Sequence, residues 1–299
     1  MSSTFRRTLA CITVLLWGAS ILPAGSARAQ PPIPTLVAIR AAHHAAPAPR
    51  FDRVVFQFSG PLPADVNVGY VPELIGDGSG LPIPIAGRAI LQVRFSLAQA
   101  HNNAGQPTAP GRRAFALPNV MQVVRSGDFE GVVTYGIGLA RREQFKVLRL
   151  QNPSRVVVDI FTPFETVWVR TYFVDSDNVA SGVGPFVRPV WRPVISPSVA
   201  RGALDRLFAG PTQAEAAQGL VFIASEATSY SNLTIASGIA RVRLRGGCNS
   251  GGSTITIANE IVPTLDQFAS VSYVKIASAS GQTASPTGNS NSIPACLEP

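Results

Sequence analysis

Few residues of this sequence could do chemistry. It has three histidines and three cysteines in 299 residues, and only His43 and His44 are adjacent. Two imidazoles could bind a metal ion or act as a base, but a metal site needs three or four ligands. His101 is the only other histidine, and no cysteine is close in the sequence. A solvated pair in a loop is the alternative interpretation, so we predict no metal and no cofactor.

Patterns typical of enzymes are also missing. A serine hydrolase elbow needs a glycine two residues before and after the serine, and no serine beyond residue 29 has both. The segment 175–178 (Asp-Ser-Asp-Asn) resembles the start of a calcium loop but lacks its glycine and distal glutamate. Gly76, Gly78 and Gly80 lack the Gly-Lys of a phosphate-binding loop and indicate a hairpin tip. We therefore expect a protein that is not an enzyme.

One group of charged residues remains as a candidate ligand site. Its members are Asp52, Arg53, Glu130, Arg155 and Asp159. They could bind a ligand, or they could form ion pairs that align the ends of strands. The sequence leaves both interpretations open.

The first 29 residues have the pattern of an export signal. Arg6 and Arg7 precede an apolar run from Cys11 to Leu22, and the segment 27–29 (Ala-Arg-Ala) supplies small residues for cleavage. We predict cleavage before Gln30, by the general or the twin-arginine route. The run is shorter than the roughly 20 apolar residues that cross a bilayer, and no later stretch is longer. We expect a secreted protein with no transmembrane segment in its mature chain.

Export also bears on the cysteines. After cleavage, Cys248 and Cys296 are the two that remain. An even count in an oxidising compartment favours a disulfide over two free thiols. Such a bridge would restrict the unfolded chain and stabilise the protein by about 2 to 4 kcal/mol.

The positive charge lies in the first half of the mature chain. Residues 30–162 hold 13 cations and 8 anions, whereas residues 163–299 hold nine of each. Twelve of the 13 cations are arginines, whose planar fork suits carboxylate and phosphate. The candidates for a polyanion-binding face are Arg112, Arg113, Arg141, Arg142 and Arg149. A solvated basic surface is the alternative. Nucleic acid fits poorly, because the protein is exported and has no basic-aromatic motif.

Residues 30–162 have the periodicity of an all-β sandwich. Val54, Phe56 and Phe58 alternate with Val55, Gln57 and Ser59. Further strands are predicted at Val66–Val71, Ile90–Phe95, Val120–Val124, Gly131–Ile137, Phe145–Leu150 and Arg155–Ile160. The segment Ala98–Leu117, rich in Asn, Gly and Pro, is interpreted as a long surface loop.

Residues 163–299 predict an α+β domain with a mixed sheet and about three helices. The helices are expected to start at Ser196-Pro197, to span Pro211–Ala217, and to follow the apolar spacing from Ile257 to Phe268. Pro263 should kink or break the third helix. The expected strands are Val167–Phe173, Pro189–Ile195, Leu220–Ile223, Asn232–Ala236, Ile239–Leu244 and Val271–Ile276. The tail 278–294 would be loose without a tether at Cys296.

The second half resembles the GerMN (sporulation and spore germination) domain over most of residues 163–277. The matching segments are 169–175, Arg201, 204–212 with its Gly-Pro-Thr turn, Glu215, 219–220, 238–242 and 264–268 leading to Val271. Pro263, Ala269 and Arg243 depart from the pattern. The resemblance implies an exported bacterial envelope protein that binds cell-wall material or a partner, with no catalytic residues.

The first half is similar to the AMIN-like domain of exported bacterial proteins, from about Leu36 to Ile160. The matching residues are Arg40, His44 and the segments 51–56, 77–80, 128–131 and 153–159. Extra residues stand between Arg40 and Phe51. This resemblance implies association with the cell wall.

The sequence therefore predicts a non-catalytic envelope protein. The sandwich would bind peptidoglycan or another anionic polymer, and the GerMN-like domain would bind a protein or glycan partner. A structural subunit of an envelope assembly is the first alternative. A regulator that presents a cell-wall hydrolase to its substrate is the second.

Overall fold

The strands of the first domain follow the alternation of apolar side chains. In strand β2, Phe51–Ser59, the residues Asp52, Val54, Phe56 and Phe58 are buried, and their neighbours are more exposed. Side chains at every second position point to one face of a strand, so β2 covers the core with one face only. The computed structural model describes residues 32–299, which form one compact unit. The predicted signal segment and its cleavage site before Gln30 lie outside the described residues.

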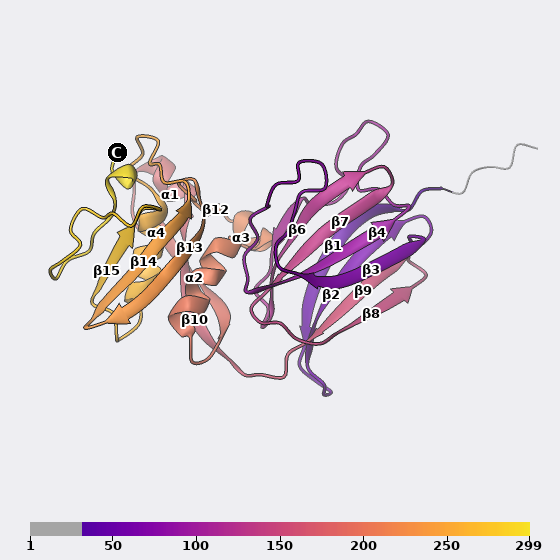
Figure 1. The fold of residues 1–299 in the computed structure, drawn as a ribbon, viewed down its shortest axis with the longest axis horizontal. Coiled ribbons are helices and arrows are strands. Elements are labelled where there is room, and N and C mark those ends of the chain that lie inside the picture. The colour runs from indigo at the N-terminus through magenta and orange to yellow at the C-terminus, as the bar shows by residue number, and fades with distance from the viewer. Residues whose placement is uncertain (1–31) are drawn as a thin grey trace, which may run out of the picture. The chain divides into compact units, whose positions relative to one another are not determined.

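Two antiparallel sheets form the sandwich (Figure 1). The first has the order β1-β2-β9-β8 and the second the order β3-β4-β7-β6-β5. The other strands are β1 Thr35–His44, β3 Asp65–Val71, β4 Ala89–Ser96, β5 Arg112–Ala114, β6 Val120–Phe129, β7 Val132–Leu139, β8 Phe145–Leu150 and β9 Arg155–Phe161. Phe56 of the first sheet meets Phe95 of the second edge to face, with ring centroids 5.1 Å apart. Such rings bury large apolar surfaces and contribute to the stability of this core.

The second domain combines two three-stranded sheets with helices. The sheets have the orders β11-β10-β12 and β13-β14-β15, and β14 pairs with β15 in parallel, so the second sheet is mixed. The strands are β10 Thr166–Asp175, β11 Val187–Ile195, β12 Leu220–Val221, β13 Ala227–Ala236, β14 Ile239–Gly246 and β15 Tyr273–Ala277. The helices are α1 Ser176–Ser181, α2 Val199–Ala209, α3 Gln213–Ala216, α4 Ile257–Asp266 and a 3₁₀ turn, Ala295–Leu297. Leu204 of α2 and Ile261 of α4 are fully buried in its core.

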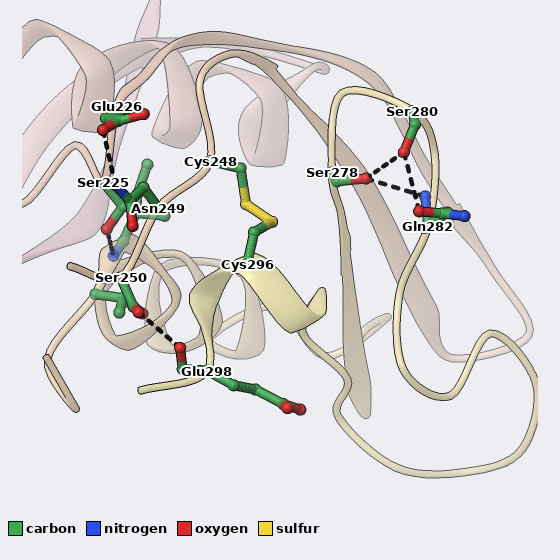
Figure 2. The surroundings of a disulfide bond; sticks show 12 residues. Ser225, Glu226, Cys248, Asn249, Ser250, Ser278, Ser280, Gln282, Cys296 and Glu298 are labelled. Atoms are coloured by element: carbon green, nitrogen blue, oxygen red, sulfur yellow. Dashed lines mark hydrogen bonds between the residues drawn. A yellow bond between two sulfur atoms is a disulfide. The ribbon is translucent and has the colours of Figure 1, made fainter. Parts of the chain in front are cut away.

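The predicted disulfide is confirmed. Cys248 and Cys296 are bonded with their Cα atoms 5.6 Å apart (Figure 2). The same region is joined by hydrogen bonds from the Ser250 N–H to the Cys296 carbonyl (2.8 Å) and from Ser250 Oγ to the Glu298 carbonyl (2.6 Å). The tail before it is also attached, because the buried Lys275 ammonium donates to the carbonyls of Ser285 and Thr287. The chain end is therefore part of the fold.

Several expectations about single elements were wrong. The segment Ala98–Leu117 is not only a surface loop, because it contains β5 and because the small side chains of Ala98, Ala100 and Ala109 are buried against the sandwich core. Strand β1 was not predicted.

The helices of the second domain differ in similar detail. Helix α1 was missed, so residues 32–299 contain four α-helices instead of about three. Helix α2 begins at Val199, after Ser198, and not at Ser196-Pro197. Helix α4 continues through Pro263 without the expected break. Proline removes one backbone hydrogen bond there, and the buried Ile261 and Leu265 keep the helix packed on the core. Among residues 32–299, no helix is both long and apolar enough to cross a membrane.

Candidate functional site

Asp52 organises the loop between β5 and β6, which contacts the second domain. Its side chain is fully buried, and its carboxylate accepts hydrogen bonds from the N–H groups of Asn119 (2.6 Å) and Val120 (2.8 Å). His43 Nδ1 lies 2.8 Å from the same carboxylate. Burial raises the pKa of Asp52, although these hydrogen bonds act in the opposite direction. Asp52 therefore holds the end of this loop in place, and its carboxylate is buried away from solvent.

Arg206 of α2 inserts into this loop from the second domain. It is 1% exposed, and its guanidinium donates to four carbonyl oxygens, those of Phe115, Leu117, Pro118 and Val120. Burial, with the nearby charge of Arg192, lowers the pKa of Arg206 to about 9, so the side chain is still charged at neutral pH. A buried cation with carbonyl partners in the other domain fixes the two domains to each other.

A second polar contact lies beside Arg206. Arg88, which precedes β4 of the sandwich, pairs with Asp205 of α2 at 2.9 Å. The Tyr230 hydroxyl donates to Asp205 (2.6 Å) and is within 3.3 Å of the Arg88 guanidinium. Burial, together with the charge of Asp205, raises the pKa of Tyr230 well above its usual value. These groups connect the sandwich to both α2 and β13.

An arginine-lined cleft opens at this junction. It has a volume of about 540 Å³, and Asp205 is the only acidic residue that lines it. We call it the arginine cleft and define it by Arg88, Arg141, Arg142, Arg201 and Arg206. Asp205 and Glu143 balance two of these charges, so the cleft keeps an excess of positive charge. Its low-dielectric walls concentrate the field of that excess.

Two of the exposed guanidinium groups have no acidic partner among residues 32–299, and the buried Arg206 bonds only to carbonyls. Arg141 pairs with Glu143 at 2.5 Å, and Arg142 stacks over the Tyr70 ring, with 4.5 Å from its Cζ to the ring centroid. Within residues 32–299, neither Arg142 nor Arg201 forms an ion pair. Both side chains are exposed to solvent, so an anion in the cleft could reach them.

Comparison with known families assigns both halves of the chain. Residues 34–162 match the AMIN-like domain, and residues 170–284 match the family described as sporulation and spore germination, the GerMN domain. The chain carries an AMIN-like domain followed by a GerMN domain. No curated protein and no solved structure matches the chain. The two domains indicate an envelope or sporulation-related protein, and the disulfide is compatible with a place outside the cytoplasm.

The five arginines proposed from the sequence lie at three places. Arg141 and Arg142 of the AMIN-like domain are in the arginine cleft. Arg112 and Arg113 are on β5 and line a different cavity. Arg149 is on β8, where its guanidinium donates to the carbonyl of Pro63. The five arginines therefore do not form one face. Arg141 and Arg142 line the cleft together with three arginines that the sequence analysis did not name.

The second candidate group is also divided. Arg53 and Asp159 are cross-strand neighbours on β2 and β9 and form a two-pronged ion pair with both N–O distances at 2.7 Å. This hydrogen bonding raises the pKa of Arg53. Glu130 is exposed in the turn between β6 and β7, and Arg155 donates only to the Pro153 carbonyl, so neither joins an ion pair among residues 32–299. Ion pairing thus explains part of this group.

The side chains of His43, His44 and Asp175 make contacts within the fold. His43 and His44 lie in β1 and not in a loop; His43 contacts Asp52, and His44 stacks on Phe51 with ring centroids 4.8 Å apart. Asp175 is the N-cap of α1 and accepts hydrogen bonds from the N–H groups of residues 177 and 178. No group of three or more metal-ligating side chains gathers in the described part of the chain.

Sequence reasoning missed Arg88, Arg201 and Arg206 as site residues. Arg201 stands in the segment that resembles the GerMN pattern, but its charge was not counted because residues 163–299 have no net charge. Arg88 and Arg206 are positioned by contacts between the AMIN-like and GerMN domains. Arg88 and its partner Asp205, for example, are 117 residues apart in the sequence. No local pattern marks such a junction.

Proposed function

We propose that the protein is a secreted, non-catalytic envelope protein that binds an anionic cell-wall polymer in the arginine cleft. The observation that carries this proposal is the pair Arg142 and Arg201, which line the cleft without acidic partners among residues 32–299. The family assignment supports the envelope setting, and the chemistry of the cleft supports an anionic ligand.

Arginine suits this role for a physical reason. Its guanidinium presents N–H donors in a planar fork that matches carboxylate and phosphate groups. It stays protonated at neutral pH and offers no lone pair, so it binds anions without acting as a nucleophile or base. The carboxylates of peptidoglycan and the phosphates of wall polymers share the chemistry that the cleft would recognise.

Sedimentation of the purified protein with isolated cell walls tests the proposal. We expect the protein to pellet with the walls at low salt and to be released as the salt approaches 1 M, where the screening length falls to about 3 Å. The double variant Arg142→Glu, Arg201→Glu should bind at least tenfold more weakly, because it places two like charges against the polymer. Walls stripped of phosphate polymers separate binding to phosphate from binding to peptidoglycan carboxylate.

The control has the same change in charge away from the cleft. Arg94 on β4 is exposed and Arg155 on β9 is half-buried, and neither lines the cleft. The double variant Arg94→Glu, Arg155→Glu should retain most of the binding. Equal loss in both double variants would indicate only an effect of net charge, and unchanged pelleting of the cleft variant would contradict the proposal.

A second candidate function is favoured by the exposed face of β10 and β11. Trp168 and Trp191 are each 61% exposed, and their strand partners Pro193 and Arg170 place them on the same face. Exposed aromatic residues are enriched where proteins contact partners. This face would be where the GerMN domain engages a protein or glycan partner, or another subunit of an envelope assembly. Self-association of the purified protein, seen in the same sedimentation experiments without walls, would favour the assembly.

A further inference from the structure

The C-terminal end of α2 borders a second cavity, separate from the arginine cleft. Its volume is about 700 Å³, and no residue that lines it lines the cleft. The AMIN-like domain contributes Arg112, Arg113 and Gln122, and the GerMN domain contributes Phe208 and Phe222 among others. We call it the interdomain pocket. Its size falls within the range of about 300 to 1,000 Å³ that is typical of small-molecule sites.

One side of the interdomain pocket is apolar. Phe208 and Phe222 meet edge to face there, with ring centroids 5.5 Å apart. Pro110, Pro211 and small alanine side chains also line the pocket. An apolar ligand body placed against these groups would be removed from water, at a gain of roughly 25 cal/mol for each Å² of apolar surface buried.

The other side carries positive charge that no acid balances. The Arg112 guanidinium donates to Gln122 Oε1 (2.9 Å) and to the Pro84 carbonyl (2.7 Å), and Arg113 donates to the Ile39 carbonyl (2.6 Å) and to Gln213. All of these acceptors are neutral. No Asp or Glu lines the pocket, and neither arginine forms an ion pair in the described part of the chain.

Arg112 is exposed on β5, so a ligand in the pocket can reach its guanidinium. Partial burial against the pocket wall lowers its pKa. Gln122 also spans the domain junction, because its Nε2 donates to the Ala209 carbonyl at 3.0 Å. The acceptor of Arg112 is thereby held in place, and so is the direction of the guanidinium.

We propose that the interdomain pocket binds a small apolar monocarboxylate, with its carboxylate at Arg112 and its apolar body against Phe208 and Phe222. A single anionic group would supply the missing counter-charge, and a charge-assisted bond to a guanidinium is stronger than the bonds to neutral acceptors. A polymer with many charges suits this pocket poorly, because much of its wall is apolar. The inference does not depend on the function proposed for the arginine cleft.

Calorimetric titration of the purified protein with octanoate and with 1-octanol tests the inference. The two probes have the same chain length and differ in charge. Octanoate is expected to bind at least tenfold more tightly than octanol. Arg112→Gln should remove this difference, and Ala216→Trp, which places a large ring at the pocket wall, should weaken both probes at least tenfold. Arg155→Gln is the matched control and should bind octanoate as the wild type does.

Two further probes distinguish the sources of such a carboxylate. N-acetyl-Ala-Leu-Leu with a free C-terminus represents a peptide end, and its C-terminal amide is its neutral partner. Binding of octanoate but not of the free peptide assigns the pocket to free carboxylic acids, whereas preference for the free peptide over the amide assigns it to peptide ends. Equal affinity for octanoate and octanol, no binding of any probe, or full octanoate binding by Arg112→Gln would overturn the inference.

Discussion

Glu260 shows how one residue can couple stability to pH. It lies on α4, is fully buried, and forms no ion pair among residues 32–299. Its two carboxylate oxygens accept hydrogen bonds from the N–H groups of Val174 (3.2 Å) and Ile223 (3.1 Å), which join α4 to β10 and to the segment after β12. Burial raises the pKa of Glu260 well above 4.5, and the two hydrogen bonds only partly oppose it.

The sign of the resulting pH dependence follows from proton binding. Above pH 4.5 the unfolded chain has released the Glu260 proton, whereas the folded protein still holds it. We therefore expect the contribution of Glu260 to the free energy of unfolding to fall as the pH rises from 4.5 toward its folded pKa. Urea unfolding at a series of pH values measures this slope.

The variant Glu260→Gln isolates the contribution of Glu260. Its amide cannot ionise, so the difference in unfolding free energy between wild type and variant should change with pH in this window. The buried Asp52 acts with the same sign and is present in both proteins, so it cancels in the difference. A difference that stays constant between pH 4.5 and pH 8 would contradict the assignment.

At the scale of elements, α3 is held by one charge pair. Glu215 is the third residue of this four-residue helix, and its carboxylate pairs with Arg192 of β11, which is 2% exposed. Burial alone would raise the pKa of Glu215, but the hydrogen bond and charge of Arg192 outweigh it and lower the pKa. Glu215 also accepts from the Thr212 N–H at 2.8 Å, which completes a capping box.

We expect Glu215→Gln to destabilise the protein by about 3 kcal/mol, because it leaves the buried Arg192 without a counter-charge. The glutamine oxygen can still accept the Thr212 N–H, so this loss reports mainly the charge. Thr212→Val removes the capping hydroxyl alone and should cost only about 1 kcal/mol. Denaturant unfolding of both variants measures the two costs. Similar costs would show that capping, and not the charge pair, holds α3.

The elements also show how far sequence reasoning reaches. Strand β2 and helix α2 were predicted because apolar residues recur at every second position in a strand and at every third and fourth position in a helix, and both patterns are local. The disulfide followed from cysteine count and compartment. Strand β1 ends with His43 and His44, which were interpreted as a loop, so its pairing with β2 was not predicted. Pairing with β2 is a tertiary contact that no local pattern reveals. Helix α1 lies in a polar segment, buries no residue and has local caps at Asp175 and Gly182, but this segment was compared with a calcium loop instead.

Less of the candidate site than of the fold could be predicted from the sequence. Arg141 and Arg142 were named from the sequence, but the cleft that contains them also needs Arg88, Arg201 and Arg206. A cleft at a domain junction depends on which loop meets which helix, and that choice is made by long-range contacts. A count of charges in each half assigned the positive excess to one domain, whereas the structure combines arginines of both.

At the scale of the whole molecule, these contacts predict that the AMIN-like and GerMN domains unfold together. Arg206 donates to four carbonyls of residues 115–120, Arg88 pairs with Asp205, and a β-bridge joins Ala114 to Thr212. Separating the domains would exchange these charge-assisted hydrogen bonds for bonds to water, at about 1.5 to 3 kcal/mol for each charged group. Wild-type protein should therefore show one cooperative transition in differential scanning calorimetry.

The variant Arg206→Met keeps the length and apolar stem of the side chain but removes all of its donors. We expect it to lose about 3 kcal/mol, to melt about 6 to 12 °C lower, and to separate into two transitions, since each domain keeps its own core. Arg201→Gln, on the same helix but exposed, should melt as the wild type does. A lower midpoint with a single transition would mean that Arg206 stabilises one domain only and that other contacts hold the junction closed.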